Sequence, residues 1–351
     1  MSAPPSHPSV PAADRADEPP PARPAPTRRR PSLTARLVIA ALLGLALSVV
    51  VLPDRWFGLD QYSPFAQLGA FRPMAFLAVA ALVVVLGLIT IKVRMLWPFT
   101  AAALALALTS GAFLLPRTIA DPVPAGGSTL KVLSYNVYEG RADVTTLAAL
   151  IHAEKPDLIA LPEAGERFRQ KLAPLIEDLG YRSRSSVTTR QPDVSGVTVF
   201  TAARLGDVQF EVAPSDVTFR SVTATGGALG DLRFVGFHSV APTPGYGVGQ
   251  WKEDLLGVQQ WCGATTPTIV AGDFNATFDH SVMREGTAGC GDAASQAGQG
   301  LTSSWPTWAP RWVGPQIDHV LGTSGIAAES FAVEEGAGSD HRPILTTLRV
   351  P

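Results

Sequence analysis

Three long apolar runs dominate the first third of the chain. They cover residues 37–52, 73–91 and 95–115. A helix needs about 20 mostly apolar residues to cross the hydrocarbon core of a bilayer, and the second and third runs supply them. The first run is slightly short, but it reaches Thr34 if the Arg36 side chain extends towards the interface. We therefore predict a membrane anchor of three transmembrane helices over residues 33–116.

Two other interpretations of these runs stay open. A cleaved signal peptide would explain the first run, yet a long Pro-rich segment precedes it and two more runs follow. Helices buried in a protein core would explain all three runs, but their length and lack of charge argue against this. The flanking segments differ: residues 1–32, rich in Pro and Arg without apolar periodicity, predict a disordered cytoplasmic tail, and the Pro- and Gly-rich residues 117–127 predict a linker.

Positive charge is distributed unevenly around the runs. Residues 28–30 are all arginine and flank the first run, and Lys92 and Arg94 lie in the short turn between the second and third. The connection 53–72 and the exit from the third run are poorer in cations. Because cytoplasmic loops are enriched in Lys and Arg, we predict a cytoplasmic N-terminus and an extracytoplasmic C-terminal domain. From Ser128 on, that domain carries 17 Lys and Arg against 24 Asp and Glu, and this net charge of −7 disfavours a generic nucleic-acid binder.

From Ser128 the pattern changes to short apolar segments that alternate with amphipathic ones. Strands are predicted at residues 130–137, 157–163, 196–201, 208–212, 217–224, 232–240, 268–274, 317–322 and 344–350, and helices at 143–154, 164–179 and 250–262. Consecutive strands in the middle, with helices elsewhere, favour an α/β sandwich of two sheets covered by helices. We assign residues 128–351 to this domain.

Several of the predicted strands are followed closely by a polar residue suited to holding a divalent metal and a phosphate. These residues and their neighbours are Asn136, Glu163, His238, Asp273, Asn275, Asp318, Asp340 and His341. An acid or an amide at the end of a buried strand is costly unless something occupies the adjacent cleft. Plainer roles are the alternative: a turn for Asn136, a favourable charge at a helix N-terminus for Glu163, and a structural hydrogen bond for His238.

Six segments resemble, in order, the motifs of the endonuclease/exonuclease/phosphatase superfamily: SYNV, LPEA, GFHSVAP, AGDFNAT, QIDHVL and GSDHRP. GDFN followed by SDHRP is specific, and the resemblance runs from about residue 130 to residue 350. It implies a DNase I-like fold and a metal-dependent phosphoric ester hydrolase. Bacterial membrane-anchored members linked to glycopeptide resistance are similar to this chain.

The resemblance implies a metal site. Glu163 would bind the catalytic Mg²⁺, with Mn²⁺ as an alternative ion, because carboxylate oxygens suit such hard cations. Asn136 would lie close to both the metal and the phosphate. Asp340 would contribute to a second metal position or to charge balance.

The resemblance also implies catalytic roles. Asp318 would orient His341 and stabilise its charged form opposite the leaving group, and Asp273 would orient or deprotonate the attacking water. Asn275 and His238 would donate hydrogen bonds to the phosphate oxygens as charge builds on them. The role of general base stays divided between Asp273 and His341.

Two arginines are weaker candidates for substrate contacts. Arg342 either grips phosphate or pairs with an acid. Arg204 matches the arginine of a Ser-Arg pair found in many relatives, but Ala203 replaces the serine, and this puts the substrate contact in doubt.

Tryptophans and cysteines add two further alternatives. Trp305, Trp308 and Trp312 lie in a Pro-rich loop that either packs on the domain or forms an aromatic rim at the bilayer surface. Cys262 and Cys290 either form a disulfide, which an extracytoplasmic domain favours, or stay as buried thiols.

These features together predict an extracytoplasmic, Mg²⁺-dependent phosphodiesterase or phosphatase anchored in the lipid bilayer. The resemblance suggests a lipid-linked (pyro)phosphate of the cell envelope as substrate. A surface nuclease acting on extracellular DNA or RNA is the rival enzyme, and an inactive binding or sensor module is the alternative outside catalysis. The intact polar set argues against the inactive module, and the sequence carries no signal for an oligomeric state.

Overall fold

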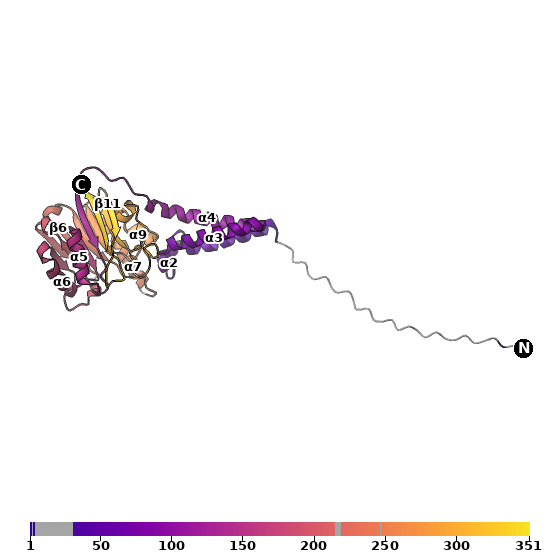
Figure 1. The fold of residues 1–351 in the computed structure, drawn as a ribbon, viewed down its shortest axis with the longest axis horizontal. Helices are drawn as coiled ribbons and strands as arrows, with labels where there is room; N and C mark the ends of the chain where they lie inside the picture. Colours follow the sequence, from indigo (N-terminus) through magenta and orange to yellow (C-terminus); the bar gives the residue numbers. More distant parts are fainter. Residues whose placement is uncertain (2, 4–30, 215–218, 246) are drawn as a thin grey trace.

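Three long helices project from one end of a domain built from two stacked sheets (Figure 1). This computed structural model describes residues 1, 3, 31–214, 219–245 and 247–351. The tail predicted at residues 1–32 therefore lies almost entirely outside the described residues.

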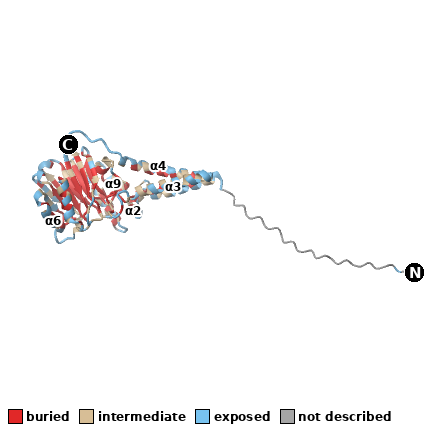
Figure 2. Cartoon of the chain, viewed as in Figure 1, coloured by how far each residue is buried: buried red, intermediate tan, exposed pale blue. Residues whose placement is uncertain are grey.

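The projecting helices are α1 (Leu33–Val51), α3 (Arg72–Lys92) and α4 (Trp97–Leu114). Each is long and apolar enough to cross a membrane. Much of their apolar surface faces outwards, as the tan and blue colouring of Figure 2 shows, and Leu88 and Ile91 are 63% and 72% exposed. A continuous apolar surface of this size marks a contact region, and for helices of this length it suits lipid.

The two ends of this helical anchor differ in charge. The N-terminus of α1 and the turn between α3 and α4 lie at the end remote from the domain, where the Arg36 guanidinium donates to the Met95 carbonyl oxygen over 3.0 Å. The connection from α1 to α3, which contains the short helix α2 (Phe65–Gly69), lies at the domain. The cations at positions 36, 92 and 94 therefore gather at one end and the domain sits at the other.

Two six-stranded sheets form the domain and confirm the predicted sandwich. The first has the order β11 (Ala327–Val333), β12 (Ile344–Val350), β1 (Ser128–Ser134), β2 (Leu158–Pro162), β4 (Val197–Thr201) and β3 (Arg182–Ser185). The second has the order β5 (Val208–Val212), β6 (Val222–Gly226), β7 (Arg233–His238), β8 (Thr268–Asp273), β10 (Asp318–Thr323) and β9 (Cys290–Asp292). In each sheet one central pair is parallel, β1 with β2 and β7 with β8, and the other pairs are antiparallel.

Central strands are apolar on both faces because both faces are covered. In β2, Leu158 and Ala160 join the core between the sheets, while Ile159 and Leu161 point towards the outer helices. Alternate residues of a strand face opposite sides, so burial on both sides requires a continuous apolar run. The central strands accordingly form the buried red layer in Figure 2.

Helices cover the outer faces of the two sheets. Those packed with the first sheet are α5 (Val144–Glu154) and α6 (Glu166–Leu172), and those packed with the second are α7 (Gly247–Gly257), α8 (Gln259–Cys262) and α9 (Ser281–Gly286). A further short helix, α10 (Ala293–Gln296), packs beside β11. The predicted helix at 143–154 is confirmed, and Asp143 caps it by accepting from the Thr146 amide over 2.7 Å.

Other predictions needed correction. The helix expected at 164–179 is α6 followed by a 3-10 segment over Ala173–Leu179, and the one expected at 250–262 is divided into α7 and α8. Strands β3, β9 and β11 were not predicted. Strand β3 reads RSRS and has no apolar face, and β9 is only three residues long, so neither carries a periodic signal.

A disulfide joins Cys262 at the end of α8 to Cys290 at the start of β9. Of the two alternatives that the sequence left open for these cysteines, the structure has the disulfide. The bond therefore fixes the end of α8 to β9, the edge strand of the second sheet.

Candidate active site

Strand register brings three of the predicted residues to one edge of the second sheet. His238 ends β7 and lies in register with Asp273, which ends the parallel strand β8. Asp318 begins the antiparallel strand β10 and also lies in register with Asp273. Strands β7 and β8 run in parallel and end side by side, and the antiparallel strand β10 begins at that same end of the sheet. The three side chains therefore gather there.

The first sheet supplies two more residues from the same end of the sandwich. Glu163 directly follows β2, and Asn136 follows β1 by two positions. The Asn136 amide donates to Glu163 Oε1 over 3.0 Å and to Asp273 Oδ2 over 2.9 Å, and so it links the two sheets. The second Glu163 oxygen accepts from the Glu139 backbone amide over 2.6 Å.

Backbone strain concentrates around this point. Glu163 has φ of 58° and Asn275 has φ of 47°, and Tyr138 and Glu139 also adopt the left-handed conformation. Each such residue costs about 1–2 kcal/mol, so tertiary contacts must hold it. A glycine is required at position 272, directly before Asp273, because of close packing. A Cβ there would lie 1.8 Å from the Phe237 carbonyl oxygen.

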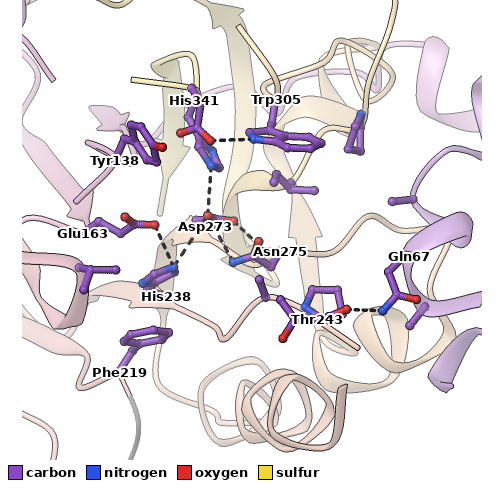
Figure 3. A pocket seen from close by; sticks show the side chains of 18 of the residues that line it. Gln67, Tyr138, Glu163, Phe219, His238, Thr243, Asp273, Asn275, Trp305 and His341 are labelled. Atoms are coloured by element: carbon purple, nitrogen blue, oxygen red, sulfur yellow. Dashed lines mark hydrogen bonds and ion pairs between the residues drawn. The ribbon is translucent and has the colours of Figure 1, made fainter. Parts of the chain in front are cut away.

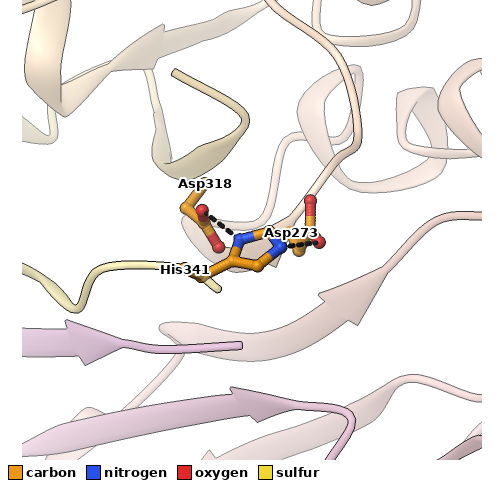
Figure 4. A group of neighbouring side chains, drawn as sticks. All are labelled: Asp273, Asp318 and His341. Atoms are coloured by element: carbon orange, nitrogen blue, oxygen red, sulfur yellow. Dashed lines mark hydrogen bonds and ion pairs between the residues drawn. The ribbon is translucent and has the colours of Figure 1, made fainter. Parts of the chain in front are cut away.

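His341 lies between two carboxylates (Figure 4). Its Nδ1 is 2.8 Å from Asp318 Oδ2 and its Nε2 is 3.6 Å from Asp273 Oδ2. Burial by itself lowers the pKa of His341, but the charges of Asp318 and Asp273 outweigh it and raise the pKa to about 10. Burial raises the pKa of Asp273 to about 7 despite the nearby imidazolium. This arrangement holds a proton on His341 and favours proton uptake by Asp273.

His238 is the neutral histidine of the site. Its ring stacks on Phe219 with centroids 4.2 Å apart, and its Nε2 lies 3.9 Å from both Glu163 Oε1 and Asp273 Oδ2. Burial, aided by the charge of His341, lowers the pKa of His238 to about 3. A neutral imidazole here can donate one hydrogen bond into the site without adding charge.

These side chains line a cavity of about 530 Å³ (Figure 3). Among the described residues, four acids line it, namely Glu139, Glu163, Asp273 and Asp340, and a fifth, Asp318, pairs with His341 behind the wall. Burial raises the pKa of Glu163, and Asp340 Oδ1 is buried without a hydrogen-bond partner among the described residues.

The donor set fits a divalent cation. Buried carboxylates that outnumber the positive charges near them, with one oxygen free, match the oxygen ligands that Mg²⁺ prefers. Asp273, Asp318 and His341 also lie close enough together to share an ion, with candidate ligand atoms within 4.8 Å of one another. Both nitrogens of His341 already face carboxylates, however, so this group is better described as an ion-pair network. Glu163, Asn136 and Asp340 are the residues that would hold a metal.

Other predicted residues are placed as follows. The Asn275 amide donates to the Ser239 carbonyl oxygen over 3.0 Å and its side chain lines the cavity. Asp340 also lines it, and its Oδ2 accepts from Trp305 Nε1 over 3.1 Å. Trp305 is therefore part of the cavity wall, whereas Trp308 and Trp312 are exposed on the same loop.

Both predicted arginine contacts lie elsewhere. The Arg342 guanidinium donates to the carbonyl oxygens of Pro306, Thr307 and Ala309. It therefore holds the loop that carries Trp305, Trp308 and Trp312, here called the tryptophan loop. Arg204 pairs with Asp157 near the start of β1. Carbonyl oxygens bind the Arg342 guanidinium and a carboxylate pairs with Arg204, and neither arginine lines the cavity.

Sequence reasoning missed several residues of the cavity wall. Tyr138 and Phe219 carry no motif, and Phe219 follows a segment outside the described residues. Residues of the α1–α3 connection, including Gln67 and Phe71, also line the cavity. No local pattern could have placed them there, because they are more than 60 positions from the motif residues in the sequence.

Comparison with known proteins agrees with this geometry. The model of the Endonuclease/Exonuclease/phosphatase family matches residues 133–341, more than half of the chain. The chain belongs to this family. Members of the endonuclease/exonuclease/phosphatase family are metal-dependent hydrolases of phosphoester bonds, and the two-sheet domain has their DNase I-like fold.

Solved structures with this fold include a D. rerio TDP2 humanised by 14 mutations, at 17% identity and a TM-score of 0.51, with 63% of this chain and 99% of that chain covered. A variant of the Neisseria 3′ phosphatase NExo, bound to a product DNA hairpin, is similar at 18% identity and a TM-score of 0.50, with 62% and 98% covered. These identities establish the fold and nothing finer. A comparison with curated proteins finds no match.

Proposed function

We propose that this protein is an extracytoplasmic, Mg²⁺-dependent phosphodiesterase or phosphatase that acts on a lipid-linked (pyro)phosphate. The observation that carries the catalytic part is the meeting of Glu163 and Asn136 with the Asp318–His341–Asp273 network in one cavity. A bound Mg²⁺ would polarise the phosphoryl oxygen and orient the ester.

Proton transfer follows from the two perturbed pKa values. Asp273, whose pKa is raised to about 7, takes the proton of the attacking water. His341 already carries a proton and gives it to the leaving group, since Asp318 holds the charged imidazole in place. The divided role of general base is thus assigned to Asp273. Asn275 and the neutral His238 donate hydrogen bonds to the phosphate oxygens.

The lining of the cavity favours a lipid-linked substrate over nucleic acid. None of the described residues that line it is Lys or Arg. Affinity for a nucleic-acid backbone comes largely from cations that neutralise phosphates, and the domain carries a net charge of −7. An ester with a single phosphate or pyrophosphate group does not need a row of cationic side chains along its binding site.

Two observations support the extracytoplasmic orientation. Arg36, Lys92 and Arg94 lie at the end of the anchor remote from the domain, and residues 31–36 and 92–95 there contain no acid, as expected if that end faces the cytoplasm. The arginines at the domain end, Arg55, Arg72 and Arg117, are instead paired with Asp54 or Asp279. The Cys262–Cys290 disulfide lies in the domain, and disulfides persist mainly outside the cytoplasm. A reporter that is active only outside the cytoplasm, fused after Pro351, should be active; an inactive fusion paired with an active cytoplasmic reporter at the same site would overturn the orientation.

A substrate panel tests the activity. Full-length protein in detergent with Mg²⁺ is given undecaprenyl pyrophosphate, phospholipids, simple phosphodiesters, and DNA and RNA. We expect the lipid-linked pyrophosphate to be hydrolysed fastest and the Glu163→Gln variant to be slower by about 10²-fold or more on every substrate. Preferred cleavage of nucleic acid would support a surface nuclease instead, and no hydrolysis by the wild type would support the inactive module.

A further inference from the structure

The connection between α1 and α3, residues 53–71, is here called the anchor loop, and it packs directly on the catalytic domain. Ala66 is 1% exposed and belongs to the apolar cluster under the second sheet that contains Trp251. His280 Nε2 donates to the Ala66 carbonyl oxygen over 2.9 Å, and the Gln67 amide donates to the Pro242 carbonyl oxygen. The loop is therefore part of the folded domain as well as a link between two spans.

Buried charges fix the position of the anchor loop. Asp54 pairs with Arg72 and with Arg284, the latter over 2.8 Å. Asp279 of the domain accepts from Arg72 over 3.1 Å and from Arg117 over 3.0 Å. Because the side chains of Asp54, Arg72 and Asp279 are almost fully buried, each is tolerated only with its partner in place, and so the network tolerates few other arrangements.

The fixed loop forms one wall of the catalytic cavity. Its residues Ala66, Gln67, Ala70 and Phe71 line the same cavity as the catalytic residues. In Figure 3, Gln67 and Thr243 lie on the opposite side of the view from Glu163. The cavity thus extends from the carboxylates to the membrane anchor.

Polarity changes along this cavity. Acids and histidines gather at the catalytic end, together with Tyr138 and Phe219. Among the residues that the structure describes, the wall formed by the anchor loop has no charged lining residue and consists of Ala66, Ala70 and Phe71 with the side-chain amide of Gln67. A ligand that fits both ends carries a phosphate on one side and hydrocarbon on the other, since apolar surface gains by excluding water from hydrocarbon. The apolar residue Phe71 directly precedes α3, so this part of the cavity wall lies next to one end of a predicted span.

We propose that the anchor loop is the specificity-determining element of this enzyme and binds the apolar chain of an amphiphilic phosphoester next to the scissile phosphate. The proposal rests on the proposed hydrolase function and extends it, because it assigns chain recognition to residues outside the family domain. Phe71 and Ala70 provide the contact surface, and the Asp54–Arg72–Asp279 network holds it in place.

The test compares two diesters that share one scissile bond. Methyl p-nitrophenyl phosphate and octyl p-nitrophenyl phosphate, both kept below micelle-forming concentrations, are given to full-length protein in nanodiscs with Mg²⁺. We expect kcat/KM to be at least about tenfold higher for the octyl ester in the wild type, and Phe71→Ala to lower this octyl-to-methyl ratio about tenfold, since a few hydrocarbon contacts discriminate to that extent. Ala70→Trp, which fills the wall instead of opening it, should lower the ratio as well.

Leu68→Ala is the matched control. Leu68 lies in the same loop and is 47% exposed but does not line the cavity, so the ratio should stay at the wild-type value. A wild type without chain preference, or variants at Phe71 and Ala70 that keep the full ratio, would overturn the chain-binding role. Failure of the hydrolase function would look different: the wild type would cleave both esters no faster than Glu163→Gln does.

Discussion

The Asp318–His341 pair offers the sharpest test of the site. Replacing Asp318 with Asn keeps the shape of the side chain and removes its charge. His341 is 5% exposed, and its Nδ1 lies 2.8 Å from the carboxylate. A rise in pKa from 6.5 to about 10 corresponds to roughly 5 kcal/mol of preference for the charged imidazole. Without the Asp318 charge, burial should bring the pKa of His341 down to the neutral range or lower.

Loss of that proton should remove the acid for the leaving group. We expect Asp318→Asn to lower kcat by about 10²–10⁴, the range that a positioned acid or base contributes. His341→Ala and the double variant should lose similar factors, because members of one catalytic unit are strongly non-additive. Thermal unfolding and Mg²⁺ dependence of each variant show whether the fold and the metal site are kept.

The assay is the hydrolysis of a chromogenic phosphodiester at several pH values, with kcat and KM separated. Losses that multiply in the double variant would refute the pairing, as would a His341 loss that appears only in KM. An NMR titration of the metal-free protein gives an independent answer: the His341 ring should stay protonated throughout pH 6–8 in the wild type and titrate at lower pH in Asp318→Asn.

Three further predictions concern the metal, the pH dependence of stability and the disulfide. Glu163→Gln should keep the fold but lower activity by about 10²-fold or more and weaken Mg²⁺ dependence; a variant that works normally at low Mg²⁺ would remove Glu163 from the metal site. The raised pKa of His341 means that the pair contributes its full stability below pH 6.5 and loses it as pH rises through about 10, so the difference in unfolding free energy between wild type and His341→Gln should shrink between pH 7 and 10. A constant difference by chemical denaturation would contradict this. Reduction of Cys262–Cys290, which closes a loop of 28 residues, should cost about 3–4 kcal/mol of stability and lower the melting temperature; free thiols in unreduced, denatured protein would exclude the bond.

Local sequence patterns predicted many of the helices and strands. Apolar runs long enough to cross a bilayer can be recognised by their length alone. The three anchor helices lie where these runs predicted them. Strands such as β2 and β8 are continuous apolar segments ended by an acid, so their type and their ends could be predicted. Strand β3, which reads RSRS, could not, because only its partner β4 makes it a strand.

The candidate site divides in the same way. Motif residues such as Glu163, Asp273 and His341 could be proposed from the sequence, because each lies in a motif that resembles those of the family. Their mutual placement came from register and from the approach of the two sheets: Asn136 reaches both Glu163 and Asp273 only because the ends of β2 and β8 meet. Arg342 shows the reverse case, since its neighbours on the tryptophan loop, and not its position beside His341, determine what it binds.

The anchor loop belongs wholly to the tertiary structure. By sequence, residues 53–71 are a short connection between two spans that mixes aromatic and polar residues, and nothing in their composition points to a cavity more than 60 positions further along the chain. Their place depends on Arg72, which pairs with Asp54 of the loop and with Asp279 of the domain. Buried charges select partners by proximity in the fold, which no local pattern records. The sequence determined which groups could perform the chemistry, and the packing of the anchor against the domain decided what surrounds them.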